Sequence, residues 1–372
     1  MTNNSKIVNI EKVVQGGKGL GRIDGQVVFV DRVLPGEEVR IIPQPGRGVL
    51  NVKLEEILIP SVARVKSDCP FYSRCGGCDF RHTDYETELE IKTGIFRETL
   101  QRIGKIEISP DDMSVIPSPD RNRYRIRTHF QCEQTRKGFF VKGSHDIVPV
   151  DDCLLMPVHL TPILQKTRCR NSFYLETHPF REIAYRYRKA GEVEPVKIEF
   201  DGYTMLHQPG SFFQANRFLL QKFIETVLDF AGKGNTAWEL FAGSGFLTLP
   251  LARQFLTLSA MEWSHSAVIT MKKSLSLNDI SSVSVVEGDC NRWTPVPCDV
   301  LVLDPPREGM ASELAKGVND SGIPRIVYVS CDAATLARDI RRLERYQIER
   351  VVLIDMFPGT AHFETMVRLF LK

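Results

Sequence analysis

The chain has 372 residues, 42% of them hydrophobic and 25% charged, which indicates a folded soluble protein and excludes a disordered chain. A net charge of +2 excludes a uniformly basic nucleic-acid binder, so any basic surface must be local. No apolar run reaches membrane-spanning length, no signal-peptide core follows Met1, and nine cysteines is an odd count. We therefore expect a reduced cytoplasmic protein with no membrane association, in which several of the cysteines serve purposes other than disulfides.

The first sixty residues have the pattern of a small β-barrel, with short runs of Val and Ile separated by glycine turns. Basic residues accompany these runs: Lys12, Lys18, Arg22, Arg32 and Arg40. The pattern G-G-K-G-L-G-R, then V-V-F-V and L-P-G-E, resembles the TRAM domain, an OB-type barrel attached to RNA-modifying enzymes. The resemblance implies an RNA-binding barrel over residues 1–62. Interspersed acidic residues leave solvated strand faces as the alternative.

Three cysteines then lie within ten residues: Cys69, Cys75 and Cys78. A fourth thiolate would complete a metal site, and Cys153 is the best candidate, ahead of Cys132 and Cys169. Four thiolates suit either a structural zinc ion or an iron–sulfur cluster, and spacing alone does not decide between them. Unliganded thiols are the remaining alternative.

The segment after Pro119 contains alternating arginines: Arg121, Arg123, Arg125 and Arg127. On a strand they would share one face, where like charges repel unless an anion lies against them. We predict that the anion is RNA phosphate and that a second group extends the surface, with a solvated face as the alternative. The second group comprises Arg181, Arg186, Arg188 and Lys189. Residues 63–205 are therefore predicted to form a central α/β substrate domain that carries the cysteine site.

From residue 206 to residue 372 strands alternate with helices, which predicts a doubly wound, Rossmann-like sheet with its site at the carboxyl ends of the strands. Glu262 follows Gly243 by about the interval at which an acid binds a ribose hydroxyl. Thr248 stands where a dinucleotide fold has its third glycine. S-adenosylmethionine therefore suits the loop better than NAD.

The segment Arg325 to Asp339 reads as a strand that ends in Cys331, followed by a helix with Asp332 as its N-cap. Unpaired N–H groups at the helix start would favour a reactive thiolate. A small buried cysteine is the alternative reading. Asp304 and Glu364 lie at two other expected strand ends, so an acid, a thiol and a second acid can meet there.

Together these motifs resemble the S-adenosylmethionine-dependent RNA 5-methyluridine methyltransferases of tRNA and 23S rRNA. The matching patterns are C-x5-C-G-G-C, F-x-Q-x-N, L-F-A-G-x-G, L-D-P-P-R, Y-V-S-C-[ND]-x-x-T-L-x-R-D and F-P-x-T-x-H-x-E. The resemblance implies that Cys331 is the nucleophile and Glu364 the proton acceptor. It implies a 4Fe-4S cluster on Cys69, Cys75, Cys78 and Cys153. It implies a cofactor pocket lined by Gln214, Phe241, Phe246, Glu262, Asp289 and Asp304.

One residue departs from the family pattern, because Phe246 stands where many members have Asn and cannot hydrogen-bond the cofactor. The expected protein is a monomeric enzyme that methylates C5 of a loop uridine in 23S rRNA or tRNA. Two alternatives remain. One is an RNA-binding or RNA-folding protein with a vestigial site, and the other is a methyltransferase of this fold that acts on DNA or a small molecule.

Overall fold

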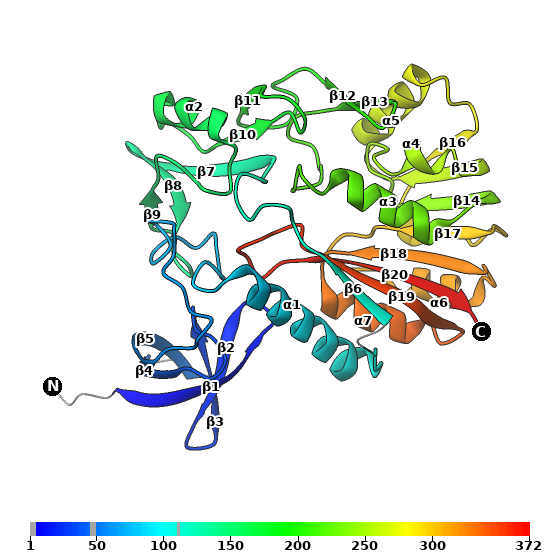
Figure 1. Cartoon of the computed structure of the whole chain (residues 1–372). Coiled ribbons are helices and arrows are strands. Elements are labelled where there is room, and N and C mark those ends of the chain that lie inside the picture. Colours follow the sequence, from blue (N-terminus) through cyan, green and yellow to red (C-terminus); the bar gives the residue numbers. More distant parts are fainter. Residues whose placement is uncertain (1–4, 45–49, 110–111) are drawn as a thin grey trace.

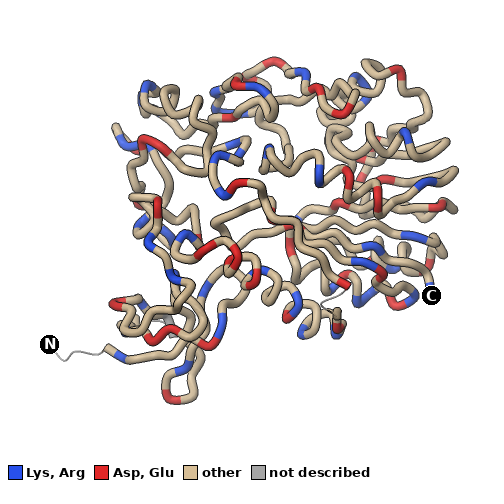
Figure 2. The backbone as a smooth tube through the Cα atoms, viewed as in Figure 1, with Lys and Arg blue, Asp and Glu red and all other residues tan. Residues whose placement is uncertain are grey.

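The structure is a computed structural model that describes residues 5–44, 50–109 and 112–372. An N-terminal barrel and a central antiparallel sheet lie on one side of the molecule, and a large mixed sheet lies on the other (Figure 1). Lys and Arg are distributed over all three parts and intermingle with Asp and Glu (Figure 2). No helix in the described ranges is long and apolar enough to cross a membrane.

The first part is a closed five-stranded barrel in the order β1-β2-β3-β5-β4. Its strands are β1 (Lys6–Val14), β2 (Lys18–Ile23), β3 (Gln26–Asp31), β4 (Glu38–Pro43) and β5 (Leu50–Ile59). The interior is packed with Val and Ile side chains. Gly19 and Gly21 are required by this packing, because a Cβ atom at either would lie 2.3 Å from Val33 or Val8. A closed barrel is present as predicted, and its assignment as an OB-type domain over residues 1–62 remains a prediction. Residues 1–4 and 45–49 of that range lie outside the described residues.

Each predicted basic residue of the barrel has a partner within the chain. Lys12 pairs with Glu98 on α1 at 2.6 Å, and Arg32 donates to the carbonyls of Ser73 and Cys75 at 2.6 and 3.0 Å. The other pairs are Lys18–Asp31, Arg22–Glu11 and Arg40–Glu56. The contacts of Lys12 and Arg32 attach the barrel to its neighbours, and the other three lie within the barrel. Charge alone therefore does not identify an RNA-binding face.

Helix α1 (Tyr85–Thr99) connects the parts, and it continues as a wider π-helical turn, η1 (Leu100–Gly104). Asp84 caps its start by accepting a hydrogen bond from the Thr87 N–H at 2.8 Å. After α1 the chain enters β6 (Met113–Ile116), which pairs with β19 as an edge strand of the large sheet. The predicted central domain therefore contributes a strand to the large sheet.

The central sheet is antiparallel in the order β11-β10-β7-β8-β9. Its strands are β7 (Arg127–Glu133), β8 (Arg136–Phe140), β9 (Ile147–Pro149), β10 (Phe173–Thr177) and β11 (Ala184–Tyr187). Beside it lie the short helices η3 (Val158–Leu160) and α2 (Thr161–Lys166) and the hairpin β12 (Val196–Phe200) and β13 (Tyr203–His207). Phe130, Phe173 and Leu175 form the centre of its core.

The predicted arginine strand is wrong, because only Arg127 lies in a strand and the other three precede it. Arg121 donates to the Phe80 carbonyl at 3.1 Å and to the Glu88 carboxylate at 2.6 Å. Arg123 has a positive φ of 57° and donates to Asp152, Cys153 and Met156. Arg125 donates to the Arg127 carbonyl and Arg127 to the Ser211 carbonyl. These bonds join loops, so the four guanidinium groups do not form one face for phosphate.

The large sheet has eight strands in the order β16-β15-β14-β17-β18-β20-β19-β6. Its remaining strands are β14 (Gly234–Leu240), β15 (Phe255–Glu262), β16 (Val283–Glu287), β17 (Val300–Leu303), β18 (Arg325–Ser330), β19 (Tyr346–Ile354) and β20 (Glu364–Leu371). The first five strands of the order are parallel, and β20 is antiparallel to both neighbours. The prediction of an α/β sheet that ends in a hairpin is confirmed.

Helices cover both faces of this sheet. They are α3 (Leu220–Ala231), α4 (Thr248–Leu251), α5 (His265–Leu277), η4 (Cys290–Arg292), α6 (Ser312–Asp320) and α7 (Ala333–Arg342). One core contains side chains of α1, α6 and α7, and a second contains those of α3. The strand order reverses between β14 and β17. Such a switch point opens a crevice at the carboxyl ends of the strands, where ligands bind in sheets of this kind.

Candidate active site

Cys331 and Glu364 are neighbours across two strands of the large sheet. Ser330, the last residue of β18, pairs with Thr365 in antiparallel β20. In an antiparallel pair, the residue after Ser330 lies across from the residue before Thr365. Those residues are Cys331 and Glu364. Asp304 follows β17, which is parallel to β18 on its other side. The predicted acid, thiol and second acid are therefore brought to the same end of the sheet, where β17 and β18 terminate and β20 begins.

The turn after Cys331 is organised by Asp332. Its carboxylate accepts hydrogen bonds from the N–H groups of Ala334 and Thr335 at 3.0 and 2.9 Å, which confirms the predicted N-cap of α7. The Ser330 hydroxyl donates to the Asp332 carbonyl and accepts from its N–H, which closes the turn. The half-buried Cys331 side chain is thus held at the end of the strand.

The electrostatic setting of Cys331 differs from the expectation of a stabilised thiolate. Burial, and then the charge of Glu364, raise the pKa of the Cys331 thiol to about 11, and Asp304 adds to the rise. The Arg307 guanidinium lowers that pKa through its charge and a hydrogen bond. Desolvation and the carboxylates outweigh the stabilising groups, so the thiol of the free protein is mostly protonated at neutral pH.

Both acids have raised pKa values. Glu364 is 8% exposed, and burial, followed by the charge of Asp304, raises its pKa well above the usual range. Burial raises the pKa of Asp304 to about 7. Arg307 lowers the pKa of Glu364 and also lies 3.2 Å from His362 Nδ1 through Nη2. A carboxylate with a raised pKa is a stronger base when ionised, which suits proton removal near neutral pH. His362 was not predicted as part of the site, although the F-P-x-T-x-H-x-E motif contains it.

The expected cofactor residues surround the loop after β14. Glu262 accepts hydrogen bonds from the Gly243 N–H at 2.9 Å and the Ser264 N–H at 2.8 Å, so it fixes the loop and retains free lone pairs. Phe241 has a φ of +64°, a strained conformation for a bulky residue, and its N–H donates to the Cys290 thiol. Gln214 is 7% exposed, and its amide makes no hydrogen bond to the described residues. It is therefore free to bind a ligand.

The two remaining cofactor candidates have structural contacts of their own. Asp289 caps η4 by accepting from the Asn291 N–H at 3.0 Å. Phe246 packs against the rings of Phe200, Phe213 and Phe223, with centroid distances of 5.9, 5.5 and 6.1 Å. This aromatic cluster accounts for Phe246 without a cofactor contact, and the role of each cofactor candidate remains a prediction.

The four predicted cluster cysteines are close enough for the charge of one thiolate to raise the pKa of another. Cys153 and Cys69 raise the pKa of the Cys75 thiol, and Cys153 and Cys75 raise that of Cys78, behind the larger effect of burial. The pKa of Cys78 reaches about 12, although Arg81 lowers it. In the part of the chain that the structure describes, no group of three His, Cys, Asp or Glu is arranged to hold a metal ion.

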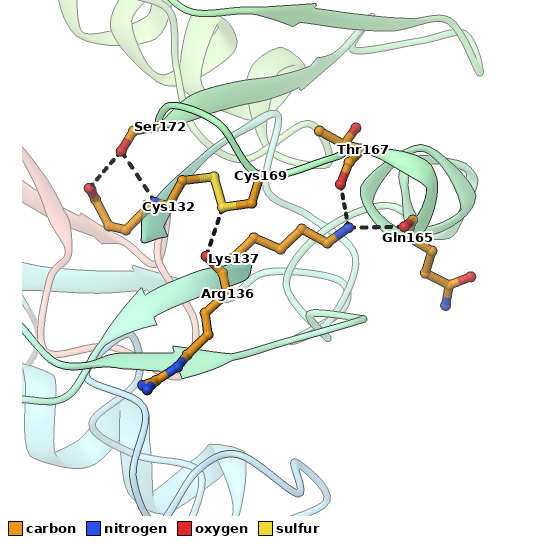
Figure 3. Close-up of a disulfide and its surroundings, with 8 residues drawn as sticks. Cys132, Arg136, Lys137, Gln165, Thr167, Cys169 and Ser172 are labelled. Atoms are coloured by element: carbon orange, nitrogen blue, oxygen red, sulfur yellow. Dashed lines mark hydrogen bonds between the residues drawn. A yellow bond between two sulfur atoms is a disulfide. The ribbon is translucent and has the colours of Figure 1, made fainter. Parts of the chain in front are cut away.

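Two other cysteines are joined by a disulfide, Cys132 in β7 and Cys169 after α2, with Cα atoms 5.5 Å apart (Figure 3). The expectation that several cysteines serve purposes other than disulfides therefore concerns the seven free ones. The Ser172 hydroxyl accepts from the Cys132 N–H, and Lys137 donates to the carbonyls of Gln165 and Thr167 beside the bond. The disulfide also removes both residues as alternatives to Cys153 for the fourth ligand.

Comparisons with known proteins show which proteins this chain is similar to. A family model described as tRNA (Uracil-5-)-methyltransferase matches residues 193–295 and 293–372. The 23S rRNA (uracil(1939)-C(5))-methyltransferase RlmD of Halomonas elongata is 30% identical over 433 residues, covering 96% of this chain and 89% of that protein. An uncharacterized RNA methyltransferase of Bdellovibrio bacteriovorus is 32% identical, covering 98% and 95%.

Among solved structures, the tRNA (uracil-54, C5)-methyltransferase of Pyrococcus abyssi in complex with S-adenosyl-L-homocysteine aligns with a TM-score of 0.79. The alignment covers 99% of this chain and 100% of that chain at 21% identity. The two chains therefore share a fold over their whole length.

Proposed function

The chain belongs to the family of S-adenosylmethionine-dependent RNA uracil-C5 methyltransferases, and we propose that it methylates a uridine of 23S rRNA or tRNA through Cys331 and Glu364. The observation that carries this proposal is the pairing of Ser330 with Thr365, which brings Cys331 and Glu364 together at the end of the sheet where the parallel strands terminate. The comparisons support both RNA classes, since relatives are named for 23S rRNA and the aligned structure for tRNA.

Uracil C5 is a poor nucleophile, so a thiolate must first add to C6 and push electron density onto C5. The Cys331 sulfur forms the C6–S bond, and Arg307 stabilises its thiolate. S-adenosylmethionine, when bound, supplies an electrophilic methyl group, which C5 attacks. The C5 proton must then leave so that the C6–S bond can break and the aromatic ring return.

Glu364 removes that proton. In the free protein the Cys331 thiolate and the Glu364 carboxylate repel each other, which raises the pKa of the thiol. Formation of the neutral C6–S bond removes the charge on sulfur, so the ionised form of Glu364 becomes more favourable at the step that needs it. Burial beside Phe363 and Met366 excludes water from the carboxylate.

A trapping experiment tests these roles. In Glu364→Gln, addition and methyl transfer need no carboxylate, whereas proton removal stalls, so a methylated protein–RNA adduct stable to denaturing gels should accumulate. Cys331→Ala should abolish both methylation and adduct while it retains cofactor binding. RNA with 5-fluorouridine should trap the wild-type protein, because fluorine cannot leave as a cation. Methylation by Cys331→Ala would overturn the covalent mechanism.

We further propose that Cys69, Cys75, Cys78 and Cys153 hold a 4Fe-4S cluster with a structural role. The electrostatic effect of each thiolate on its neighbours supports a shared site. Arg81 near Cys78 and Arg125 near Cys153 supply positive charge for an anionic cluster. A 4Fe-4S cluster is larger than a single zinc ion, so the four sulfur atoms that bind the cluster lie farther apart than four sulfur atoms that bind zinc. Protein purified without air should contain about four irons, and stoichiometric zinc without visible absorbance would refute the cluster.

The barrel order β1-β2-β3-β5-β4 supports its assignment as an OB-type TRAM domain, for which we propose RNA as the ligand. We propose that the protein acts in the cytoplasm as a monomer. Removal of the barrel should lower RNA affinity and leave S-adenosylmethionine affinity unchanged, and sedimentation should give the mass of one chain.

A further inference from the structure

We propose that the segment directly after the predicted cluster ligand Cys78 positions the catalytic base, with Asp79 as a positioning residue for proton removal. The inference rests on the proposed role of Glu364. Its basis is a dense set of hydrogen bonds between residues 79–80 and the loop 355–363, which ends at Glu364. The base would then be held by a part of the chain about 280 residues away in sequence.

Three hydrogen bonds join the two segments directly. The N–H groups of Asp79 and Phe80 donate to the Gly359 carbonyl at 2.8 and 3.0 Å. In the opposite direction, the Ala361 N–H donates to Asp79 Oδ2 at 2.9 Å. Ala361 is three residues before Glu364, so this bond fixes the backbone close to the base. Lys142 donates to Asp79 Oδ1 at 2.8 Å and holds the carboxylate in place.

Helix α1 and the loop before β7 hold the other side of the same loop. Lys92 is fully buried, and its ammonium group bonds Glu88, Asp355 and the Phe357 carbonyl at 2.7, 2.7 and 3.2 Å. Glu88 also accepts from the Gly359 N–H at 2.6 Å. The Tyr124 hydroxyl donates to the Pro358 carbonyl at 3.0 Å. The loop therefore has few unassigned backbone groups and little freedom to shift.

Such support matters because proton removal depends on the position of the base. A displacement of about 1 Å in a reacting group lowers a rate by about a hundredfold. The Asp332 cap and β18 hold Cys331, whereas the Asp79 bonds act on the loop before Glu364. Loosening the loop should therefore affect the step performed by Glu364 and spare the addition performed by Cys331.

The test is single-turnover methylation of an RNA substrate by purified wild-type protein, Asp79→Ala, Asp79→Asn and Glu364→Gln. Asp79→Ala should form the methylated adduct at a rate within about twofold of wild type and release product about tenfold or more slowly. Asp79→Asn retains a carbonyl oxygen for the Ala361 N–H and should recover most of the release rate. Iron content and S-adenosylmethionine affinity, measured alongside, should equal those of wild type.

A second variant, Tyr124→Phe, removes one hydrogen bond to the same loop and leaves the cysteine segment intact. Tyr124→Phe should slow product release from the adduct about threefold. If Asp79→Ala loses iron or fails to fold, the release rate of Tyr124→Phe decides whether the loop positions Glu364. The inference is overturned if neither variant accumulates adduct while Glu364→Gln does, or if adduct formation and release fall together. Absence of adduct in Glu364→Gln would instead overturn the proposed function.

Discussion

Replacing Arg307 tests how the site controls its nucleophile. Arg307 lowers the pKa of the Cys331 thiol, whereas burial, Glu364 and Asp304 raise it to about 11. At pH 8 about one thiol in a thousand is therefore ionised. Arg307→Met removes the favourable charge, so we expect it to raise the pKa of the Cys331 thiol. Asp304→Asn removes an unfavourable charge, so we expect it to lower that pKa.

The size of the effect follows from Coulomb's law. Two unit charges 4 Å apart interact by about 4 kcal/mol at an effective dielectric constant of 20. Arg307 is exposed, so water screens much of this energy, and we expect about 1.4 kcal/mol, which is one pKa unit. Only the thiolate is alkylated, so the reaction at a given pH should slow about tenfold in Arg307→Met.

Iodoacetamide labelling between pH 7 and 11 measures this shift, with the peptide that contains Cys331 followed by mass spectrometry. The labelling rate should rise with pH up to the thiol pKa in every variant. The curve of rate against pH for Arg307→Met should be displaced by about one pH unit toward higher pH. Arg307→Lys retains a positive charge and serves as the matched control. An unchanged curve for Arg307→Met, or equal shifts for Met and Lys, would refute the electrostatic account.

Three further predictions concern stability. Arg121→Met should lower the unfolding free energy by about 1–3 kcal/mol in urea and leave the salt dependence of RNA binding unchanged, because Arg121 bonds the protein itself. Lys92→Met should lower the unfolding free energy by about 3–5 kcal/mol, since it leaves buried Asp355 without its cation and buried Glu88 with Arg121 alone, and a milder loss would contradict the buried network. Reduction of Cys132–Cys169, which spans 37 residues, should lower stability by about 4 kcal/mol, and a double Ser variant should be insensitive to reductant.

Features that depend on neighbouring residues could be predicted from the sequence. The Asp332 cap, the strand before Cys331 and the alternation of strands and helices follow from local propensities. The structure contains each of them, with the strand ending at Ser330, one residue earlier than predicted. The closed N-terminal barrel was predicted from its glycine turns and apolar runs for the same reason.

Tertiary contacts decided the rest. The arginines from Arg121 to Arg125 alternate as they would on a strand, but they precede β7. Carbonyls and carboxylates distant in the sequence bind Arg121 and Arg123, and Arg125 donates to the nearby Arg127 carbonyl. The raised pKa of Cys331 depends on the burial and charges that Glu364, Asp304 and Arg307 create in the folded chain. Charge and desolvation depend on distances in space, and spacing along the sequence does not contain those distances. The sequence therefore determined which groups could react, and the folded structure decided which of them are free, paired or buried.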